Sequence, residues 1–135
     1  MNADIITSTA HASHANKISF PEYVGKLIEA GVEYYHVNYV TLQISFYSSE
    51  GSVVSLPVQF ESLPAVSADF DVQSLRAAIL ESQNNSQPYR KFSERAMKSG
   101  VQSYFAFLRG KRVTYIGRQG EQHTEWFPCA NAKST

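Results

Sequence analysis

The sequence predicts an α+β fold for one domain spanning residues 1–135, built from two copies of a unit in which two helices precede three strands. The first observation is an internal match. Residues 20–35 (FPEYVGKLIEAGVEYY) align without gaps on residues 89–104 (YRKFSERAMKSGVQSY), and we call positions related by this alignment equivalent. The second is periodicity: apolar residues at helical spacing precede and accompany each matched segment, and alternating runs rich in Val, Ile, Tyr and Phe follow it.

The repeats are expected at about residues 2–58 and 71–128, related by a pseudo-two-fold axis. The simplest packing for such units places the helices on one face of a mainly antiparallel sheet. The segment between the repeats, residues 57–70, contains prolines and several apolar residues. We therefore expect an ordered crossing loop at this point.

The first helix of each unit is expected to begin after a capping residue. Asn2 and Asp71 are equivalent positions, and their side-chain oxygens can accept hydrogen bonds from backbone N–H groups of the first turn. Apolar residues then recur at helical spacing. Asn16 and Asn85, which tolerate left-handed backbone, stand where the two helices should end.

The second helix of each unit is expected to end at a glycine. In the first unit Ser19 is the predicted N-cap. The apolar stripe of that helix consists of Tyr23, Leu27 and Ile28. Gly31 and Gly100 follow the two helices, because glycine accepts positive φ without strain from a Cβ atom.

Three strands are expected after each helix pair, at residues 32–40, 42–48 and 52–56, and at residues 101–109, 112–117 and 121–127. Gly51 and Gly120, again equivalent positions, mark turns. Large apolar residues of both parities occur between 101 and 109, Tyr104 and Phe105 among them. We therefore expect that strand to be covered on both faces.

The motifs of the matched segments also resemble a known family. They are F-P-x-Y at 20–23, G-V-x-Y-Y at 31–35, Y-x-x-F at 89–92 and G-V at 100–101. These motifs are similar to those of the small prophage-borne YbcV/YdfO-like proteins, over about residues 18–127. That family is of unknown function and is sometimes labelled phage envelope protein. The resemblance implies a prophage origin and brings no active site with it.

Composition predicts a cytoplasmic protein without a membrane span. No run approaches the roughly 18 apolar residues that a spanning helix needs, and the N-terminus lacks the basic region of a signal peptide. The single cysteine, Cys129, cannot form an internal disulfide, which fits a reducing compartment.

The net charge of zero hides an uneven distribution. Residues 1–87 carry three basic and nine acidic side chains, whereas residues 88–118 carry eight basic side chains and Glu94 alone. Such a split favours association. One candidate is self-association, in which the basic half of one subunit meets the acidic half of another.

The basic segment is also a candidate nucleic-acid or anion site. Its residues are Arg109, Lys111, Arg112 and Arg118, with Phe105 and Phe107 alternating on the adjoining strand. Exposed aromatic rings beside a basic hairpin can bind single-stranded nucleic acid by stacking and phosphate contacts. The sequence pI of 6.9 is low for such a domain, and no RNP-like motif occurs, so we slightly favour self-association.

A second alternative is ligand binding or catalysis in a cleft near His36. Tyr34, His36 and Asn38 alternate on one face of their strand, and a tuned imidazole can perform acid–base chemistry. No nucleophile or paired carboxylate accompanies them. We therefore favour the interpretation that these are ordinary polar side chains on a half-exposed sheet face, without a binding or catalytic role.

No catalytic residue, metal or cofactor is predicted. His11 and His14 are spaced i, i+3 but lack further metal ligands nearby in sequence, and Cys129 near His123 stands beside a tail that cannot preorganise a nucleophile. Neither phosphate-binding glycine motif occurs. We predict a non-enzymatic binding or interaction protein, and a homodimer is its candidate oligomeric state.

Overall fold

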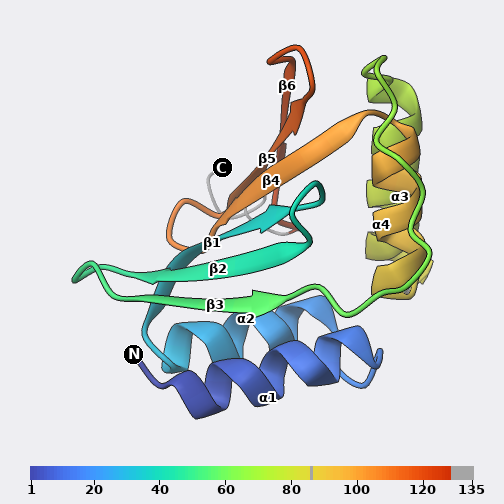
Figure 1. The fold of residues 1–135 in the computed structure, drawn as a ribbon. Helices are drawn as coiled ribbons and strands as arrows, with labels where there is room; N and C mark the ends of the chain where they lie inside the picture. The colour runs from blue at the N-terminus through green and yellow to red at the C-terminus, as the bar shows by residue number, and fades with distance from the viewer. Residues whose placement is uncertain (86, 129–135) are drawn as a thin grey trace.

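The computed structural model describes residues 1–85 and 87–128 (Figure 1). The elements of the first half are α1 (Ala3–His14), α2 (Phe20–Glu29), β1 (Val32–Asn38), β2 (Gln43–Ser48) and β3 (Val53–Pro57). Those of the second half are α3 (Val72–Asn85), α4 (Tyr89–Lys98), β4 (Val101–Phe107), β5 (Arg112–Gly117) and β6 (Gln122–Trp126). The predicted α+β fold is confirmed.

The strands form one antiparallel sheet in the order β3-β2-β1-β4-β5-β6. Two three-stranded meanders therefore meet along β1 and β4 in the middle of the sheet (Figure 1). His36 pairs with Phe105 at the centre of this ladder. On either side of that pair, Tyr34 pairs with Phe107, and Asn38 pairs with Ser103. Exchanging equivalent positions maps this ladder onto itself, which is consistent with two repeats around an axis between His36 and Phe105.

The backbone departs from regular geometry at equivalent places in the two halves. The register shifts between Val32 and Tyr34 in the pairing of β1 with β2, and between Val101 and Ser103 in the pairing of β4 with β5. The glycines that follow α2 and α4 have positive φ, 92° at Gly31 and 97° at Gly100. Left-handed backbone also recurs in the hairpins, at Leu42 and Lys111 and at Gly51 and Gly120.

The predicted helix caps are present. Asn2 Oδ1 accepts a hydrogen bond from the Ile5 N–H at 3.1 Å, and Asp71 Oδ1 accepts one from the Ser74 N–H at the same distance. Ser19 forms a capping box with Glu22 at the start of α2. These caps satisfy N–H groups that the first turn of a helix leaves without partners.

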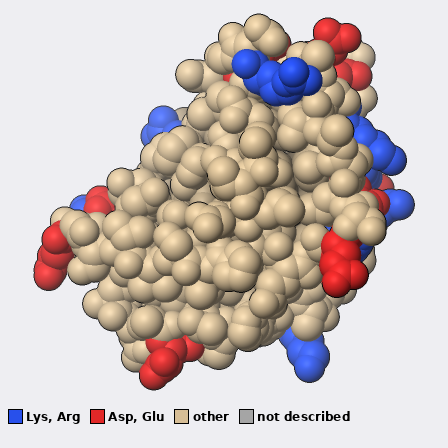
Figure 2. Space-filling model, viewed as in Figure 1, with Lys and Arg blue, Asp and Glu red and all other residues tan. Residues whose placement is uncertain are grey.

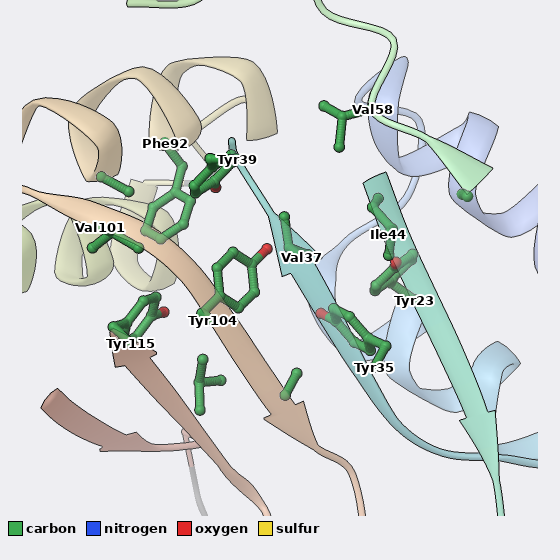
Figure 3. Close-up of a cluster of buried hydrophobic side chains, with 14 of the residues drawn as sticks. Tyr23, Tyr35, Val37, Tyr39, Ile44, Val58, Phe92, Val101, Tyr104 and Tyr115 are labelled. Carbon is green, nitrogen blue, oxygen red and sulfur yellow. The ribbon is translucent and has the colours of Figure 1, made fainter. Parts of the chain in front are cut away.

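Both helix pairs pack on one face of the sheet and bury a core rich in tyrosine. Figure 3 shows Tyr35 on β1 and Tyr104 on β4 side by side in this core. The Tyr39 hydroxyl donates a hydrogen bond to Ser93 Oγ at 3.0 Å, and the hydroxyl oxygens of Tyr89 and Tyr104 lie 2.6 Å apart. Burial raises the pKa of both Tyr39 and Tyr104 well above the ordinary value, so these phenols remain protonated.

The prediction that Ile28 belongs to the buried stripe of α2 is wrong. Ile28 is 53% exposed, whereas Met97, at the equivalent position of α4, is 3% exposed. The crossing loop accounts for the difference, because the Ser67 N–H donates a hydrogen bond to the Met97 carbonyl at 3.0 Å. That loop follows the first half alone, so it covers α4 and leaves Ile28 exposed.

Candidate functional site

The second face of the sheet is the candidate site, and we call it the open face because both helix pairs pack on the other side. Each strand contributes three residues to it. They are Tyr34, His36 and Asn38 (β1); Gln43, Ser45 and Tyr47 (β2); Val53, Ser55 and Pro57 (β3); Ser103, Phe105 and Phe107 (β4); Arg112, Thr114 and Ile116 (β5); and Gln122, Thr124 and Trp126 (β6).

The open face corrects the expectation that β4 is covered on both sides. Tyr104 and Ala106 are buried under the helices, whereas Phe105 and Phe107 are half-buried on the open face. Phe105 and Phe107, the large residues on the open-face side of β4, pack against aromatic neighbours on the sheet itself. The residue pattern of one strand does not distinguish such packing from coverage by another layer.

The open face is almost free of charge. Among the eighteen residues named above, Arg112 is the one with a formally charged side chain, counting histidine as neutral, and Glu33 in the β1 bulge beside Tyr34 is paired with Arg109. In the view of Figure 2 the Lys, Arg, Asp and Glu side chains lie around the rim, and the middle of that view carries none. The open face is thus an extended neutral surface on a chain of which 18% of the residues are charged.

Aromatic rings stack across the middle of the open face. Tyr34 stacks on Tyr47 with ring centroids 4.7 Å apart and planes 14° apart. His36 stacks on Phe105 at 4.2 Å and 19°. Phe105 and Phe107 lie 5.8 Å apart with planes within 9°. These contacts place a continuous aromatic surface over β2, β1 and β4.

Hydroxyl pairs and one cation–π contact flank the aromatic centre. Ser45 and Ser55 share a hydrogen bond of 3.0 Å, and Thr114 and Thr124 do the same at the equivalent positions of the second half. Near the β6 edge, the Arg112 guanidinium lies 4.0 Å from the ring centroid of Trp126, which is 41% exposed. The guanidinium therefore covers an indole ring.

The three residues predicted as a ligand site share the open face, as alternation implied, but they have different contacts. Asn38 Oδ1 accepts hydrogen bonds from the N–H groups of Val40 and Thr41 at 2.9 and 3.0 Å, so it holds the β1–β2 turn. Tyr34 is engaged in stacking. Desolvation by burial lowers the pKa of His36. Tyr34 and His36 therefore belong to a stacking surface, Asn38 holds a turn, and among the described hydrogen bonds and ion pairs none of the three has the carboxylate partner of an acid–base site.

Two hollows on the surface are lined by other residues than these three. One is lined by the chain start and the end of α2, from Met1 to Asp4 and from Glu29 to Gly31. The other lies beside the crossing loop and includes Tyr39, Val66 and Arg118. Neither is lined by His36.

The residues predicted as a nucleic-acid site are only partly brought together. Phe105, Phe107 and Arg112 share the open face, and Arg109 and Lys111 lie in the adjoining turn. Arg109 is paired with Glu33 at 3.8 Å. Arg118 lies at the opposite end of β5, about 20 Å from Arg112 by strand length, where it donates a hydrogen bond to the Val66 carbonyl at 3.4 Å.

The helical arginines of the basic segment also have local partners. Arg90 lies 3.2 Å from Glu94, and Arg95 lies 3.9 Å from Glu81. The strong positive balance of residues 88–118 therefore does not form one continuous basic surface. The segment is basic in sequence, but its cations are distributed over α4 and both ends of β5.

The remaining histidines do not form a site with one another. His14 Nδ1 lies 2.7 Å from the Ala10 carbonyl, and its ring packs edge-on against Phe60 and Tyr89, while His11 is exposed. His123 Nε2 lies 2.8 Å from Glu125 Oε1 on the helix side of β6. Cys129 lies outside the described residues.

Metal-binding groups and membrane-spanning helices were also sought in the residues that the structure describes. Within residues 1–85 and 87–128, no group of three or more His, Cys, Asp or Glu side chains is placed to hold a metal ion. No helix in these ranges is both long enough and apolar enough to cross a membrane.

Sequence reasoning missed the open face as a whole. It named Tyr34 and His36 in one candidate site and Phe105 and Phe107 in another, although the pairing of β1 with β4 brings these four rings together. Taking every second residue of each predicted strand, on the side away from the helices, would have revealed a nearly uncharged face. The strand order, which joins the two halves along β1 and β4, was needed to make it one surface.

Comparison with known proteins identifies a family without a known activity. The family model described as "Protein of unknown function (DUF1398)" matches residues 3–125. No curated protein matches the sequence. The match covers all ten helices and strands except the end of β6.

Proposed function

We propose that this chain, which belongs to the DUF1398 family of proteins of unknown function, is a non-enzymatic interaction module that pairs with a second copy of itself through the open face. The observation that carries the proposal is the neutrality of that face, where Arg112 carries the one formal charge among the eighteen strand residues assigned to it. Neutrality matters because a two-fold dimer brings residues near its axis against their own copies, so charged groups there repel each other.

The chemistry of the open face suits pairing with itself. Its aromatic centre offers apolar area, with Tyr34 and Phe107 beside the central pair of His36 and Phe105. Hydroxyl groups such as those of Ser45 and Thr114 both donate and accept hydrogen bonds, so a copy of the same face offers them suitable partners. Aromatic residues and a lack of charge are typical of interface cores.

The area of the open face is sufficient for a specific dimer. Six strands spaced about 4.8 Å apart, with about six residues each at about 3.4 Å, give roughly 600 Å² per copy. Pairing two such faces removes about 1,200 Å² from water, which is the lower end of the range for specific interfaces. Two twisted sheets pack face to face in β-sandwiches with their strands about 30° apart.

Single-stranded nucleic acid is the second candidate, favoured by the parallel rings of Phe105 and Phe107. Stacking on such rings tolerates any base, but the backbone also needs cations. Arg112 is the open-face cation, and Arg109 is already beside Glu33. The charge available therefore supports protein pairing over phosphate binding. Small-molecule binding near His36 has less support, because that ring stacks on Phe105 and its ladder partners Ser45 and Phe105 carry no carboxylate.

Sedimentation equilibrium over a wide concentration range tests the pairing. We expect the natural chain to have twice the 15.1 kDa mass of one copy. The Phe105→Glu variant should remain folded by circular dichroism and sediment as a monomer. Ile28→Glu, which changes an exposed apolar residue on α2, should remain a dimer. Phe107→Thr is a second open-face variant that keeps strand propensity, and it should also weaken pairing.

Two results would refute the pairing proposal. One is a natural chain that stays monomeric up to millimolar concentration. The other is a pair of folded variants, Phe105→Glu and Phe107→Thr, that dimerise as strongly as the natural chain. Fluorescence anisotropy with a labelled single-stranded oligonucleotide addresses the second candidate. Binding that falls steeply with salt and is weakened by Arg112→Gln would favour nucleic acid.

We also propose a cytoplasmic location and a prophage origin. The single cysteine supports the location, and the F-P-x-Y and G-V-x-Y-Y motifs at residues 20–23 and 31–35 support the origin. Fractionation of cells that express the chain checks the first proposal, and sequencing of the DNA flanking its gene checks the second. Recovery in the membrane or envelope fraction, or flanks without phage genes, would argue against them.

The organisation as one domain with repeats at about residues 2–58 and 71–128 is likewise a proposal. It is supported by β-ladder registers, left-handed residues and hydroxyl pairs that recur at equivalent positions of the two halves. A chain with its two halves in the opposite order tests it, because related halves should fold in either order.

A further inference from the structure

We infer that protonation of His36 controls the pairing of the open faces, so that two copies separate in mildly acidic solution. This inference rests on the proposed function. It concerns regulation of the same surface and can fail while the pairing itself stands. Its basis is the position of one imidazole at the centre of a face that otherwise carries a single charge.

His36 occupies the centre of the open face. It pairs with Phe105 in the middle of the β1–β4 ladder, and β1 and β4 are the two central strands of the sheet. When two such faces overlap fully, centre lies opposite centre across the spacing of about 10 Å between packed sheets. The two imidazoles of a dimer therefore lie in the part of the interface that is most remote from water.

Among residues 1–85 and 87–128, the open-face neighbours of His36 include no acid. Along β1 its open-face neighbours are Tyr34 and Asn38, and directly across β2 and β4 lie Ser45 and Phe105. The other open-face residues of β2 are Gln43 and Tyr47, and those of β4 are Ser103 and Phe107. The charged group on this face is Arg112 of β5, a second cation. Glu33 is engaged by Arg109 near the β4–β5 turn.

Pairing of two open faces would disfavour the protonated, positively charged form of His36. Burial already lowers the pKa of His36 in a single copy, and loss of the remaining water in a dimer acts in the same direction. Stacking on Phe105 at 4.2 Å gives the cation a weak partner in place of water. Two imidazolium groups in one interface would also repel each other.

The sign of the pH effect follows from proton linkage. The separated chain binds a proton at His36 that the dimer excludes. Pairing is therefore full above the His36 pKa of the separated chain, which burial places below the ordinary histidine value, and it weakens as the pH falls through that pKa. Two protons are taken up for each dimer that separates. The dissociation constant should therefore rise between about pH 7.5 and about pH 5.5, by several-fold or more and by at most about a hundredfold, because burial lowers the pKa at which the two protons bind.

The other histidines provide matched controls. His11 is exposed on α1. His14 lies between α1, the crossing loop and α4, and His123 lies beside Glu125, so both are on the helix side of the sheet. His11→Gln therefore removes a titrating imidazole that does not belong to the open face. His36→Gln removes the imidazole of the open face and retains the other three.

Sedimentation equilibrium of the full chain at the two pH values tests the inference, with circular dichroism to confirm folding at both. The natural chain and His11→Gln should dimerise at about pH 7.5 and separate at about pH 5.5. His36→Gln should dimerise at both values. His36→Lys, which carries a charge throughout, should be a folded monomer at both. His36→Phe provides a second neutral variant if the glutamine weakens pairing by itself.

The outcomes separate the two proposals. A natural chain that is a monomer at both pH values refutes the pairing and this inference with it. Dimers of the natural chain that persist at the lower pH refute the control by His36 and leave the pairing intact. Separation of both neutral His36 variants at the lower pH, while they remain folded, assigns the pH effect to other groups and also refutes the inference.

Discussion

His36 and Phe105 stack at 4.2 Å between ring centroids, and they are also backbone partners in the ladder that joins β1 to β4. The two positions are equivalent, so each occupies the place of the other under the internal match. A two-fold axis normal to the sheet would pass between them. The first half has an imidazole at this position, and the second half has a phenyl ring. The open face therefore has one imidazole at its centre.

Gly100→Ala should destabilise the fold more than Gly120→Ala. Both glycines have positive φ, so each substitution incurs backbone strain of about 1 kcal/mol or more. A Cβ at Gly100 would also overlap the Asp69 carbonyl oxygen and lie 2.9 Å from Phe70 Cα, whereas a Cβ at Gly120 meets nothing within 4 Å. Urea unfolding should show a loss of about 3 kcal/mol or more for Gly100→Ala and about 1 kcal/mol for Gly120→Ala. Equal losses would contradict the close approach of the crossing loop to α4.

The stability of the fold should fall as the pH drops below the ordinary histidine pKa, because of His14. Burial lowers the pKa of His14, and its Nε2 atom is buried without a hydrogen-bond partner. In the interval between the folded and unfolded pKa values the unfolded chain binds the proton, so protonation favours unfolding. Stability should therefore be full above the unfolded value, decrease with pH through that interval, and level off below the folded value.

Urea midpoints at about pH 7.5 and about pH 5.5 measure this effect, in a Phe105→Glu background to remove any contribution from pairing. His14→Gln should reduce the pH dependence, and the exposed His11→Gln should leave it unchanged. An unchanged slope in His14→Gln would assign the effect to another group.

The hydrogen bond from Tyr39 to Ser93 should couple β1 to α4. Ser93 is fully buried, and its hydroxyl accepts from the Tyr39 hydroxyl at 3.0 Å. Ser93→Ala leaves a buried phenol without this partner and should cost about 1–3 kcal/mol. Tyr39→Phe with Ser93→Ala should be less damaging than the sum of the two single changes, by about 1 kcal/mol. Additive losses in urea unfolding would show that the two hydroxyls are not coupled.

The elements that depend on local chemistry could be predicted from the sequence. Asn2 and Ser19 cap helices by bonding to backbone a few residues away, and Gly31 and Gly100 adopt a backbone that most residues avoid. Each of these effects is decided within one helical turn. Helix pairs and strands followed from such residues together with periodicity.

Features that depend on the pairing of distant segments could not be predicted. Ile28 and Met97 have equivalent sequence positions, but the crossing loop reaches Met97 alone. Arg112 and Arg118 are close in sequence, yet β5 separates them by its length. The ring of Phe105 faces away from the helices and is half-buried by its own neighbours, which the alternation along one strand does not reveal.

A chain with its halves in the opposite order should reach the same fold. If the repeats are related by a two-fold axis, the path from the end of β6 to the start of α1 matches the path from the end of β3 to the start of α3. The crossing loop spans the second path, so a connection of similar length should span the first. We expect a chain that begins at Ser62, joins residue 135 to residue 1 through a short Gly/Ser linker, and ends at Glu61 to unfold cooperatively.

The cut between Glu61 and Ser62 falls between two exposed residues of the crossing loop and leaves every helix and strand whole. The control is the natural order with the same linker inserted between residues 61 and 62, which separates the cost of interrupting the loop from the cost of reordering. The free energies of unfolding of the two chains should agree within about 1–2 kcal/mol, because a longer loop costs little closure entropy. A rearranged chain that lacks native circular dichroism, beside a control that folds, would show that the two halves are not interchangeable in order.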